Sequence, residues 1–547
     1  MRTRDRLLHS LCFLLLPLLA TPAASLVFEV DRVDDVAALF GCDSAVMLDC
    51  SLRTAITLAN ANPGPDEIVL PAATFEIEIA GIQELNNQTG DLNVLDDVVI
   101  RGTPGARPLI TTVIPEQLLD IATGVSFELR DVDLFRTGSS NSNIVLRSGG
   151  QTLVKLESVN IERQGVVNDA MRLFGTTELR DVVVKSPNGR ALDADGDVYI
   201  EDSEFEGHVA VFSSDGASLS LIDSVVEWTA TSSPNNLSSA VRFVGGDLWI
   251  EGTEIRGSEI ESVEGALPAT GLFVSNASGA VTIIGSHIRG FAGTNGGGII
   301  VQSAASVTVE DSLIEQNSAS AGMGGGMRLL SLATNSYATS ISGTTFTGNE
   351  APGTLGEGGA IHVDDDLTLV VHNSTFSGND ARFGGAIWAA SMTDTSLVHV
   401  TMSDQTSSVG GAIFSLGTVD FESSLISGDC AGAGLRTSFG SNLESPGDTC
   451  GFNLSSDRPS IADPALAPLA DNGGPTPTRL PFVGSLARDF ANCALAVDQR
   501  GAARPFDGGG GLLCDAGAVE AGSSPPGWIF GDGFESGSVS AWTAVQD

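Results

Sequence analysis

A short motif recurs between residues 296 and 428 and constrains this chain more than any other feature. Each copy opens with glycines and an apolar residue, and an alternating stretch follows. The glycine-rich openings are GGGI at 296–299, GGGM at 324–327, and GGAI at 358–361, 384–387 and 410–413. An internal repeat of this length predicts stacked structural units, each in contact only with its neighbours.

A weaker form of the repeat extends upstream. One apolar position ends each copy, and its spacing varies from 21 to 33 residues. The shortest spacings are nearly equal, and the longer ones vary. This is expected of stacked coils in which some coils carry loop insertions. The aligned residues are Ile161, Val184, Phe205, Val226, Ile255, Ile288, Ile314, Phe346, Phe376, Met402 and Ile426.

The coils are predicted to be made of strands. Short runs such as LSLID at 219–223 and VTVED at 307–311 alternate apolar and polar residues and are rich in Val, Ile and Thr. Gly and Asn recur between these runs, at the expected corners of the coils, where we expect residues that tolerate positive φ. No helix of crossover length separates the runs. The predicted fold is therefore all-β, a right-handed parallel β-helix with a cap at each end.

The glycine motif followed by Phe-x-Gly-Asn, as in FTGN at 346–349 and FSGN at 376–379, resembles the repeats of polymorphic outer-membrane proteins and related bacterial β-helices. The resemblance covers residues 296–428 well and the upstream coils loosely. It implies the fold and says little about function.

Charge narrows the range of partners. The chain of 547 residues has a formal net charge of −41. Such acidity argues against binding nucleic acid or an anionic membrane surface, because like charges repel. It favours solubility and could attract divalent cations.

Residues 1–25 read as a signal peptide. Arg2, Arg4 and Arg6 precede an apolar run at 7–20, and TPAAS at 21–25 supplies small residues for cleavage. The run is too short for a stable membrane span. We therefore expect a secreted or cell-surface protein with no membrane-spanning segment in the mature chain.

Residues 26–110 are predicted to form the N-terminal cap. Ser51 can cap a short helix whose apolar side is Leu52, Ala55, Ile56 and Ala59. This segment resembles the CSLREA domain of bacterial surface β-helix proteins, through CSLRTAI at 50–56 and ANA at 59–61, with Thr54 where the family has Glu. The resemblance implies a surface or secreted protein and supplies no catalytic residue.

Residues 111–431 are assigned to the β-helix repeats and 432–522 to the C-terminal cap. The cap resembles the choice-of-anchor Q domain, through NGGPT at 472–476, DQRG at 498–501 and CDAGA at 514–518, and departs from it at 485–490. The resemblance implies surface display.

Residues 523–547 are interpreted as a linker and a C-terminal tail. Two interpretations of the tail remain: a sorting signal, or a strand that docks on the C-terminal cap.

Six cysteines remain after the leader, and they fall in local pairs outside the repeat body. An even number in an exported chain predicts disulfides, and nearest-neighbour pairing suits a solenoid whose ends are far apart. Zinc binding is the rival interpretation, but the spacing lacks C-x₂-C pairs. The pairs are Cys42 with Cys50, Cys430 with Cys450, and Cys493 with Cys514.

One stretch invites a calcium interpretation. Asp193, Asp195, Asp197 and Asp202 lie near one turn, and carboxylate oxygens at alternate positions suit Ca²⁺. Val198 stands where an EF-hand loop needs Gly, so solvated corner carboxylates are the simpler account. We expect no cofactor and no metal.

A second stretch invites a catalytic interpretation. Asp364, Asp365 and Asp366 precede a strand, and paired carboxylates on a β-helix can act as acid and base on a glycan. His362 and His372 lie in the neighbouring sequence, and Arg382 could assist. No complete catalytic constellation is present, and a polar turn explains the aspartates equally well.

The sequence therefore predicts a binding or structural, adhesin-like protein that meets a glycan or a protein at a cell surface, as a monomer and without nucleic acid. The alternative is a polysaccharide lyase or glycoside hydrolase acting in a groove along the β-helix. Trp228, Trp249 and Trp388 are candidate sugar platforms, although single tryptophans more often serve packing.

Overall fold

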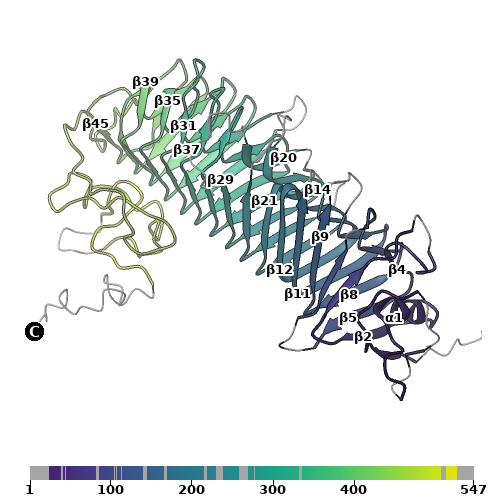
Figure 1. The fold of residues 1–547 in the computed structure, drawn as a ribbon. Helices are drawn as coiled ribbons and strands as arrows, with labels where there is room; N and C mark the ends of the chain where they lie inside the picture. The colour runs from purple at the N-terminus through teal and green to yellow at the C-terminus, as the bar shows by residue number, and fades with distance from the viewer. Residues whose placement is uncertain are drawn as a thin grey trace, which may run out of the picture.

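The computed structural model shows a long right-handed parallel β-helix, as the repeat predicts (Figure 1). It describes residues 24–526, except 38–40, 43–44, 82–84, 104, 106, 113, 139–143, 166–168, 215–217, 230–237, 258–268, 276, 332–335 and 507–512. The predicted signal peptide at 1–25 and the predicted tail at 523–547 therefore lie almost wholly outside the described residues.

Each coil places strands on successive faces of the rod, and every strand pairs in parallel with its counterpart one coil away. The first face contains β4 (Leu92–Val94), β7 (Leu119–Ile121), β10 (Leu146–Ser148), β17 (Ser238–Val244), β20 (Ala269–Ser275), β24 (Ile299–Val301), β28 (Met327–Leu329), β32 (Ile361–Val363), β36 (Ile387–Ala389), β40 (Ile413–Ser415) and β43 (Cys430–Ala431).

The second face is the longest stack. It contains β1 (Val27–Glu29), β2 (Asp66–Leu70), β5 (Val98–Gly102), β8 (Ser126–Arg130), β13 (Val198–Glu201), β15 (Leu219–Ile222), β18 (Leu248–Glu251), β21 (Ala280–Ile284), β25 (Ser306–Glu310), β29 (Ala338–Ser342), β33 (Thr368–His372), β37 (Asp394–Val398), β41 (Thr418–Glu422) and β44 (Arg436–Ser438).

The third face carries the position that was aligned in the sequence. It contains β3 (Thr74–Ile77), β6 (Leu109–Thr112), β9 (Asp133–Gly138), β16 (Val225–Trp228), β19 (Glu254–Gly257), β22 (His287–Arg289), β26 (Leu313–Glu315), β30 (Thr345–Thr347), β34 (Thr375–Ser377), β38 (Thr401–Ser403), β42 (Leu425–Ser427) and β45 (Leu443–Ser445).

Three long strands bend from one face to the next: β11 (Thr152–Gly165), β12 (Met171–Asp195) and β14 (Glu204–Ser214). A separate narrow sheet joins β23 (Ala292–Gly293), β27 (Ser318–Ala319), β31 (Glu350–Ala351), β35 (Asp380–Phe383) and β39 (Thr406–Val409).

The register predicted from the repeat is confirmed. From Ile161 to Ile426, each aligned apolar residue is the strand partner of the next. All of them are buried. Because alternate residues of a strand point to opposite sides, this register sends one set of side chains into the core and the other set out from the rod.

The repeated asparagines have a role that differs from the predicted one. Asn317, Asn349 and Asn379 are fully buried and hydrogen-bonded to one another, and Gln405 continues the ladder. Positive φ falls on the residue just before each ladder residue, such as Gly348 at 60°. The Asn side chains therefore satisfy buried backbone groups at the bend instead of supplying its positive φ.

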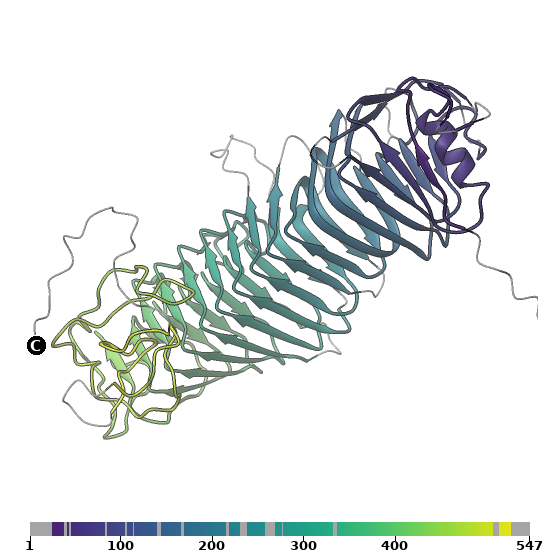
Figure 2. The same cartoon turned by 90° about the horizontal axis from the view of Figure 1, so that it is seen from below.

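The N-terminal end carries α1 (Leu52–Ala59), packed against β1, β2 and β4 (Figure 2). The predicted cap is confirmed, since the Ser51 hydroxyl accepts a hydrogen bond from the Thr54 amide at 3.2 Å. Arg53 was not anticipated: it is buried, forms a bidentate ion pair with Asp35, and donates to the Gly90 carbonyl. This buried pair ties the helix to the chain on both sides of it.

Asp91 is a buried carboxylate beside this helix. Burial, Glu116 and Asp120 raise its pKa to about 6. A raised folded-state pKa means that the folded protein holds the proton more tightly, so this contribution to stability is present below about pH 4 and is lost as the pH rises through 6. We expect Asp91→Asn to raise the free energy of unfolding by about 1–3 kcal/mol at pH 7.5 and to change it little at pH 4.

Denaturant unfolding at both pH values measures this effect. Asp394→Asn is the matched control, because Asp394 is exposed on β37. An equal change at pH 7.5 and pH 4, or a change that Asp394→Asn reproduces, would contradict the assignment.

The C-terminal segment, residues 462–506 and 513–526, folds back along the outside of the third face over the last coils (Figure 2). Threonines of β30, β34 and β38 meet it directly. The Gln499 amide, for example, donates to Thr345 and accepts from Thr375. The rod itself ends at β43 and β45, beneath Phe452.

The three predicted disulfides are present: Cys42–Cys50, Cys430–Cys450 and Cys493–Cys514. Disulfides of this number are typical of proteins outside the reducing cytosol. Within the part of the chain that the structure describes, no helix has the length and apolar character needed to cross a membrane.

Candidate functional site

A continuous row of outward side chains follows the first face, and we call it the outer row. Strand register defines its members, because each is the partner of the next. Eight coils at the ~4.8 Å spacing of neighbouring strands give the row a length of roughly 34 Å. The outer row consists of Phe212, Arg242, Phe273, Ile300, Arg328, His362, Trp388 and Phe414.

The core fixes the direction of these side chains. On β17 the neighbours of Arg242 are the buried Val241 and Phe243, and on β32 the neighbours of His362 are the buried Ile361 and Val363. With the neighbours packed inward, the residue between them must point out from the sheet. Aromatic and cationic side chains therefore stack along the first face at a spacing of one coil.

One half of the outer row alternates arginine with phenylalanine. The Arg242 guanidinium lies 5.0 Å from the ring centroid of Phe273 and 6.0 Å from that of Phe212. Arg190, at the edge of the row, lies 4.6 Å from the Phe212 ring on its other side. These are cation–π distances, so the rings hold the guanidiniums in place.

Arg190 belongs to a cluster of paired charges. Asp193 accepts from Arg190 at 2.8 Å and from Arg172 at 3.1 Å. Asp169 pairs with Arg172 at 2.5 Å. Burial raises the pKa of Asp169, while Arg190 and Arg172 act in the opposite direction. The two carboxylates neutralise Arg172 and Arg190 and position them.

Arg242 differs from Arg172 and Arg190 because its side chain forms no hydrogen bond or ion pair with any residue that the structure describes. Burial lowers its pKa, and the nearby positive charge of Arg190 lowers it further. A partly buried guanidinium without a carboxylate partner is unusual in a chain of net charge −41. Among the described residues, its N–H groups meet aromatic rings and no hydrogen-bond acceptor.

The other half of the row centres on His362 and Trp388. Their rings stack at 4.5 Å with an interplanar angle of 7°, and His362 is buried. The imidazole lies between two carboxylates, with Nε2 3.2 Å from Glu357 and Nδ1 3.8 Å from Asp364. Below it, Arg328 donates to the Asn295 carbonyl at 3.0 Å. The half-buried Trp388 thus has a fixed ring plane at the surface.

The other candidate catalytic residues are not brought to this point. His372 ends β33 on the second face, where burial lowers its pKa. Arg382 lies on β35 and donates to the Thr354 carbonyl. Asp365 accepts from the Ser391 amide at 2.9 Å, and Asp366 occupies a turn with φ of 61°. Of the six candidates, His362 and Asp364 are brought together as a pair, with Nδ1 3.8 Å from the carboxylate.

The calcium candidates are also dispersed. Asp193 pairs with arginines, and Asp197 accepts from the backbone and hydroxyl of Ser218. Asp195 lies at the end of β12, and Asp202 occupies an exposed turn after β13. Over the described ranges, no three His, Cys, Asp or Glu side chains are grouped so that they could hold a metal ion.

Sequence reasoning missed most of the outer row. Arg242 and Arg328 attract no notice in the sequence, because what distinguishes them is their register with aromatic residues a full coil away. Trp388 was singled out and lies in the row. Trp249 is exposed on the second face, and Trp228 is buried on the third. Aligning the residue between the two inward positions of each first-face strand would have revealed the row.

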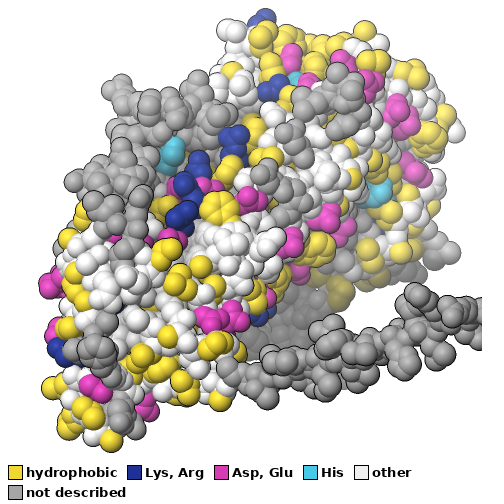
Figure 3. Space-filling model, turned by 90° about the vertical axis from the view of Figure 1, so that its right-hand side faces the viewer, with side chains coloured by type: hydrophobic (Ala, Val, Ile, Leu, Met, Phe, Trp, Pro, Cys, Tyr) yellow, Lys and Arg dark blue, Asp and Glu magenta, His cyan; other side chains and the backbone are white. Residues whose placement is uncertain are grey.

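The surface shows an uneven distribution of charge. On the side seen in Figure 3, Lys and Arg side chains gather in one area beside exposed hydrophobic side chains, whereas Asp and Glu are spread more widely. Cationic side chains are therefore concentrated in one area of a chain whose overall charge is strongly negative.

Comparison with known proteins agrees with the fold. A family model described as a right-handed β-helix region matches residues 188–402 and 270–445. No curated protein matches the sequence.

Two solved structures resemble the chain distantly. The pectate lyase Pel9A has 11% identity and a TM-score of 0.29, over 91% of this chain and 97% of that chain. The A-module of the mannuronan C-5 epimerase AlgE6 of Azotobacter vinelandii has 14% identity and a TM-score of 0.23, over 73% and 95%. Neither likeness bears on what this chain binds. Family model and strand topology agree that the chain is a right-handed parallel β-helix protein.

Proposed function

We propose that this protein binds an extended glycan chain along the outer row, in an adhesin-like role outside the cell. The observation that carries the proposal is the eight-coil outer row on the first face, in which every member except Ile300 is aromatic or cationic. Aromatic rings offer apolar faces to sugar rings, and a row of weak contacts gains affinity through multivalency. The three disulfides, and the resemblance of the two ends to CSLREA and choice-of-anchor Q domains, support a place at the cell surface.

Within this proposal, the glycan carries carboxylates. Arg242 has no carboxylate partner of its own among the described residues, and a guanidinium is a preferred partner of carboxylates because it can donate two parallel hydrogen bonds. The net charge of −41 opposes the approach of any polyanion, so the attraction must come from the local arginines. This contact is the reason to prefer a polyuronate over a neutral chain.

Binding fits the row better than cleavage does. Trp388 covers one side of the His362 ring, and His372 and Arg382 belong to other strands. The paired carboxylates Glu357 and Asp364 flank a buried imidazole. They orient the ring beneath Trp388, and this arrangement supports a platform for a ligand more than an acid–base pair.

Retention of the mature chain on immobilised polysaccharides tests the proposal. We expect retention on a polyuronate and weaker retention on its neutral methyl ester. Trp388→Ala should reduce the affinity at least about tenfold, the equivalent of losing one good aromatic contact. Trp249→Ala is the matched control, because Trp249 is exposed on the second face and bonded to Glu251. Equal losses in both variants, or no retention on any glycan, would overturn the proposal.

A further inference from the structure

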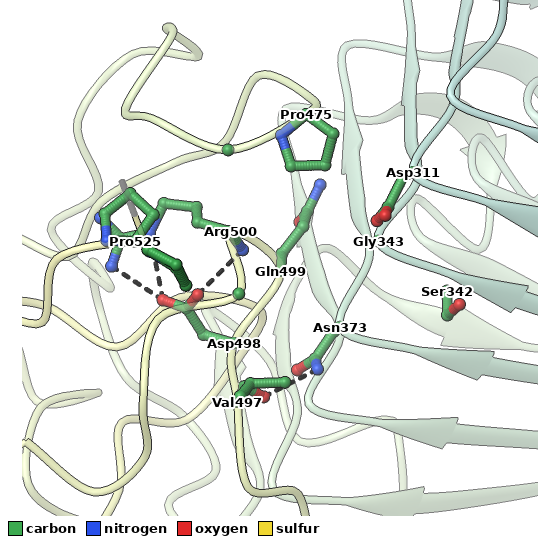
Figure 4. Close-up of a pocket in the computed structure, with 13 residues that line it drawn as sticks. Asp311, Ser342, Gly343, Asn373, Pro475, Val497, Asp498, Gln499, Arg500 and Pro525 are labelled. Carbon is green, nitrogen blue, oxygen red and sulfur yellow. Dashed lines mark hydrogen bonds and ion pairs between the residues drawn. The ribbon is translucent and has the colours of Figure 1, made fainter. Parts of the chain in front are cut away.

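A pocket of about 680 Å³ lies where the C-terminal segment meets the rod, away from the outer row. Asp311 and Asn373 face it from the rod, and Pro475, Gln499, Arg500 and Pro525 face it from the C-terminal segment (Figure 4). The pocket is open on one side and combines apolar proline walls with a few polar atoms. Pockets of this kind suit small groups that have an apolar part and one polar end.

Two polar side chains on the rod side, Asn373 and Asp311, present acceptors that no described residue satisfies. The oxygen Oδ1 of Asn373 is buried and has no hydrogen-bond partner among the described residues, while the amide nitrogen of Asn373 donates to the Val497 carbonyl at 2.8 Å. Asn373 as a whole is 9% exposed. A buried acceptor without a donor destabilises the folded protein, so a ligand that donates to it would remove that cost.

Asp311 supplies the second acceptor. It occupies a turn with φ of 49° and is exposed on the pocket side, and its carboxylate forms no ion pair or hydrogen bond with a described residue. The carboxylate leans over Gly343 of the next coil, where an added Cβ would lie 1.9 Å from Oδ1. Loss of surrounding water and the nearby Glu310 raise the pKa of Asp311. Among the described residues, no cation acts on the pKa of Asp311 in the opposite direction.

The donors on the opposite wall are already used. Arg500 pairs with Asp498 at 2.8 Å and also donates to the carbonyls of Glu520 and Ser523. The Gln499 amide donates to Thr345 and Thr476. Two acceptors on the rod side, the Asp311 carboxylate and Asn373 Oδ1, therefore lack donors among the described residues and lie next to apolar walls. The Ser342 hydroxyl, which can donate or accept, also lines the pocket.

We infer that this pocket binds an alkylammonium group, of the kind carried by a lysine side chain or an alkyl diamine. The ammonium would donate to the Asp311 carboxylate and toward Asn373 Oδ1, and its alkyl stem would lie against Pro475 and Pro525. An ammonium has three donors and no acceptor, which complements the Asp311 carboxylate and Asn373 Oδ1. This inference is independent of the glycan-binding proposal.

Ligand-observed NMR titration of the full mature chain tests the inference. The probes are Nα-acetyl-lysine methylamide, 1,4-diaminobutane, and Nα-acetyl-norleucine methylamide as the uncharged counterpart. We expect the lysine derivative to bind at least tenfold more tightly than the norleucine derivative. If the diamine binds as well, any alkylammonium is accepted; if it does not, the site takes a lysine side chain of a partner. Both results support the inference.

Asp311→Asn keeps the shape and the turn, since Asn tolerates positive φ, and should weaken lysine binding at least tenfold. Asp223→Asn is the matched control. Asp223 occupies the same turn position with φ of 47°, and its carboxylate likewise lies over a glycine, Gly252, but it does not line this pocket. Equal binding of the lysine and norleucine derivatives, absence of binding, or equal losses in both variants would overturn the inference.

Discussion

Asn349→Ala is expected to lower the free energy of unfolding by about 3–5 kcal/mol. Asn349 is fully buried in the ladder, where its amide nitrogen donates to the Ile314 carbonyl at 2.8 Å and to Asn379 at 3.0 Å. Its oxygen accepts from the backbone and the side chain of Asn317. Alanine leaves several of these groups buried without partners, and each costs roughly 1–3 kcal/mol.

Denaturant unfolding of the mature chain measures the loss. Asn453→Ala is the control, because Asn453 is exposed beyond the last coil. Asn349→Gln should lose less, since Gln405 already fills a ladder position and accepts from Asn379. A loss below about 1 kcal/mol for Asn349→Ala would show that the ladder contributes little to the stack.

Arg242→Gln is expected to weaken binding of a polyuronate at least about tenfold and binding of its neutral methyl ester less than about twofold. The guanidinium rests on the Phe273 ring and meets no carboxylate in the described chain, so a ligand carboxylate is its natural partner. A hydrogen bond to a charged group contributes roughly 1.5–3 kcal/mol, and 1.4 kcal/mol corresponds to a factor of ten. The variant should also show a weaker dependence on salt.

Equilibrium binding with fluorescent polysaccharide at two salt concentrations measures this difference. Arg130→Gln is the control, because Arg130 is exposed on the second face and already paired with Glu128. If both glycans lose affinity equally in Arg242→Gln, then the arginine supports the shape of the row and does not recognise a carboxylate.

The sequence predicts the fold well because a β-helix repeats its constraints on every coil. The buried Phe346 is followed by Phe376 and Met402 at the equivalent position of the next two coils, so the repeat can be recognised from the sequence. The helix cap at Ser51 and the local cysteine pairs were also predicted correctly. These features depend on residues close in sequence or on a period that can be counted.

What the sequence does not reveal depends on contacts between distant residues. The partner of Arg53 is Asp35, and two partners of Gln499, Thr345 and Thr375, lie more than 100 residues earlier. Nothing in the local pattern points to either. The recurring Asn was assigned to the corner itself, because Asn tolerates positive φ, whereas its buried hydrogen bonds appear only when the coils are stacked.

The candidate site was predictable only in part. His362 and Asp364 were chosen for their chemistry and do lie together, at 3.8 Å. Arg382 and His372 were chosen for the same reason but belong to different strands of the coil. The outward residues differ from one coil to the next, so their alignment into a row becomes visible only once the strand register is known.

The most direct test of the account is the dependence of affinity on glycan length. Uronate oligomers of increasing length would be titrated into the mature chain and into Trp388→Ala. If the ligand lies along the outer row, affinity should rise with each added sugar until the oligomer spans roughly the 34 Å of the row, and then level off. Trp388→Ala should lower the plateau. An affinity that is the same for a dimer and for a long chain, and that is unchanged in the variant, would contradict the account.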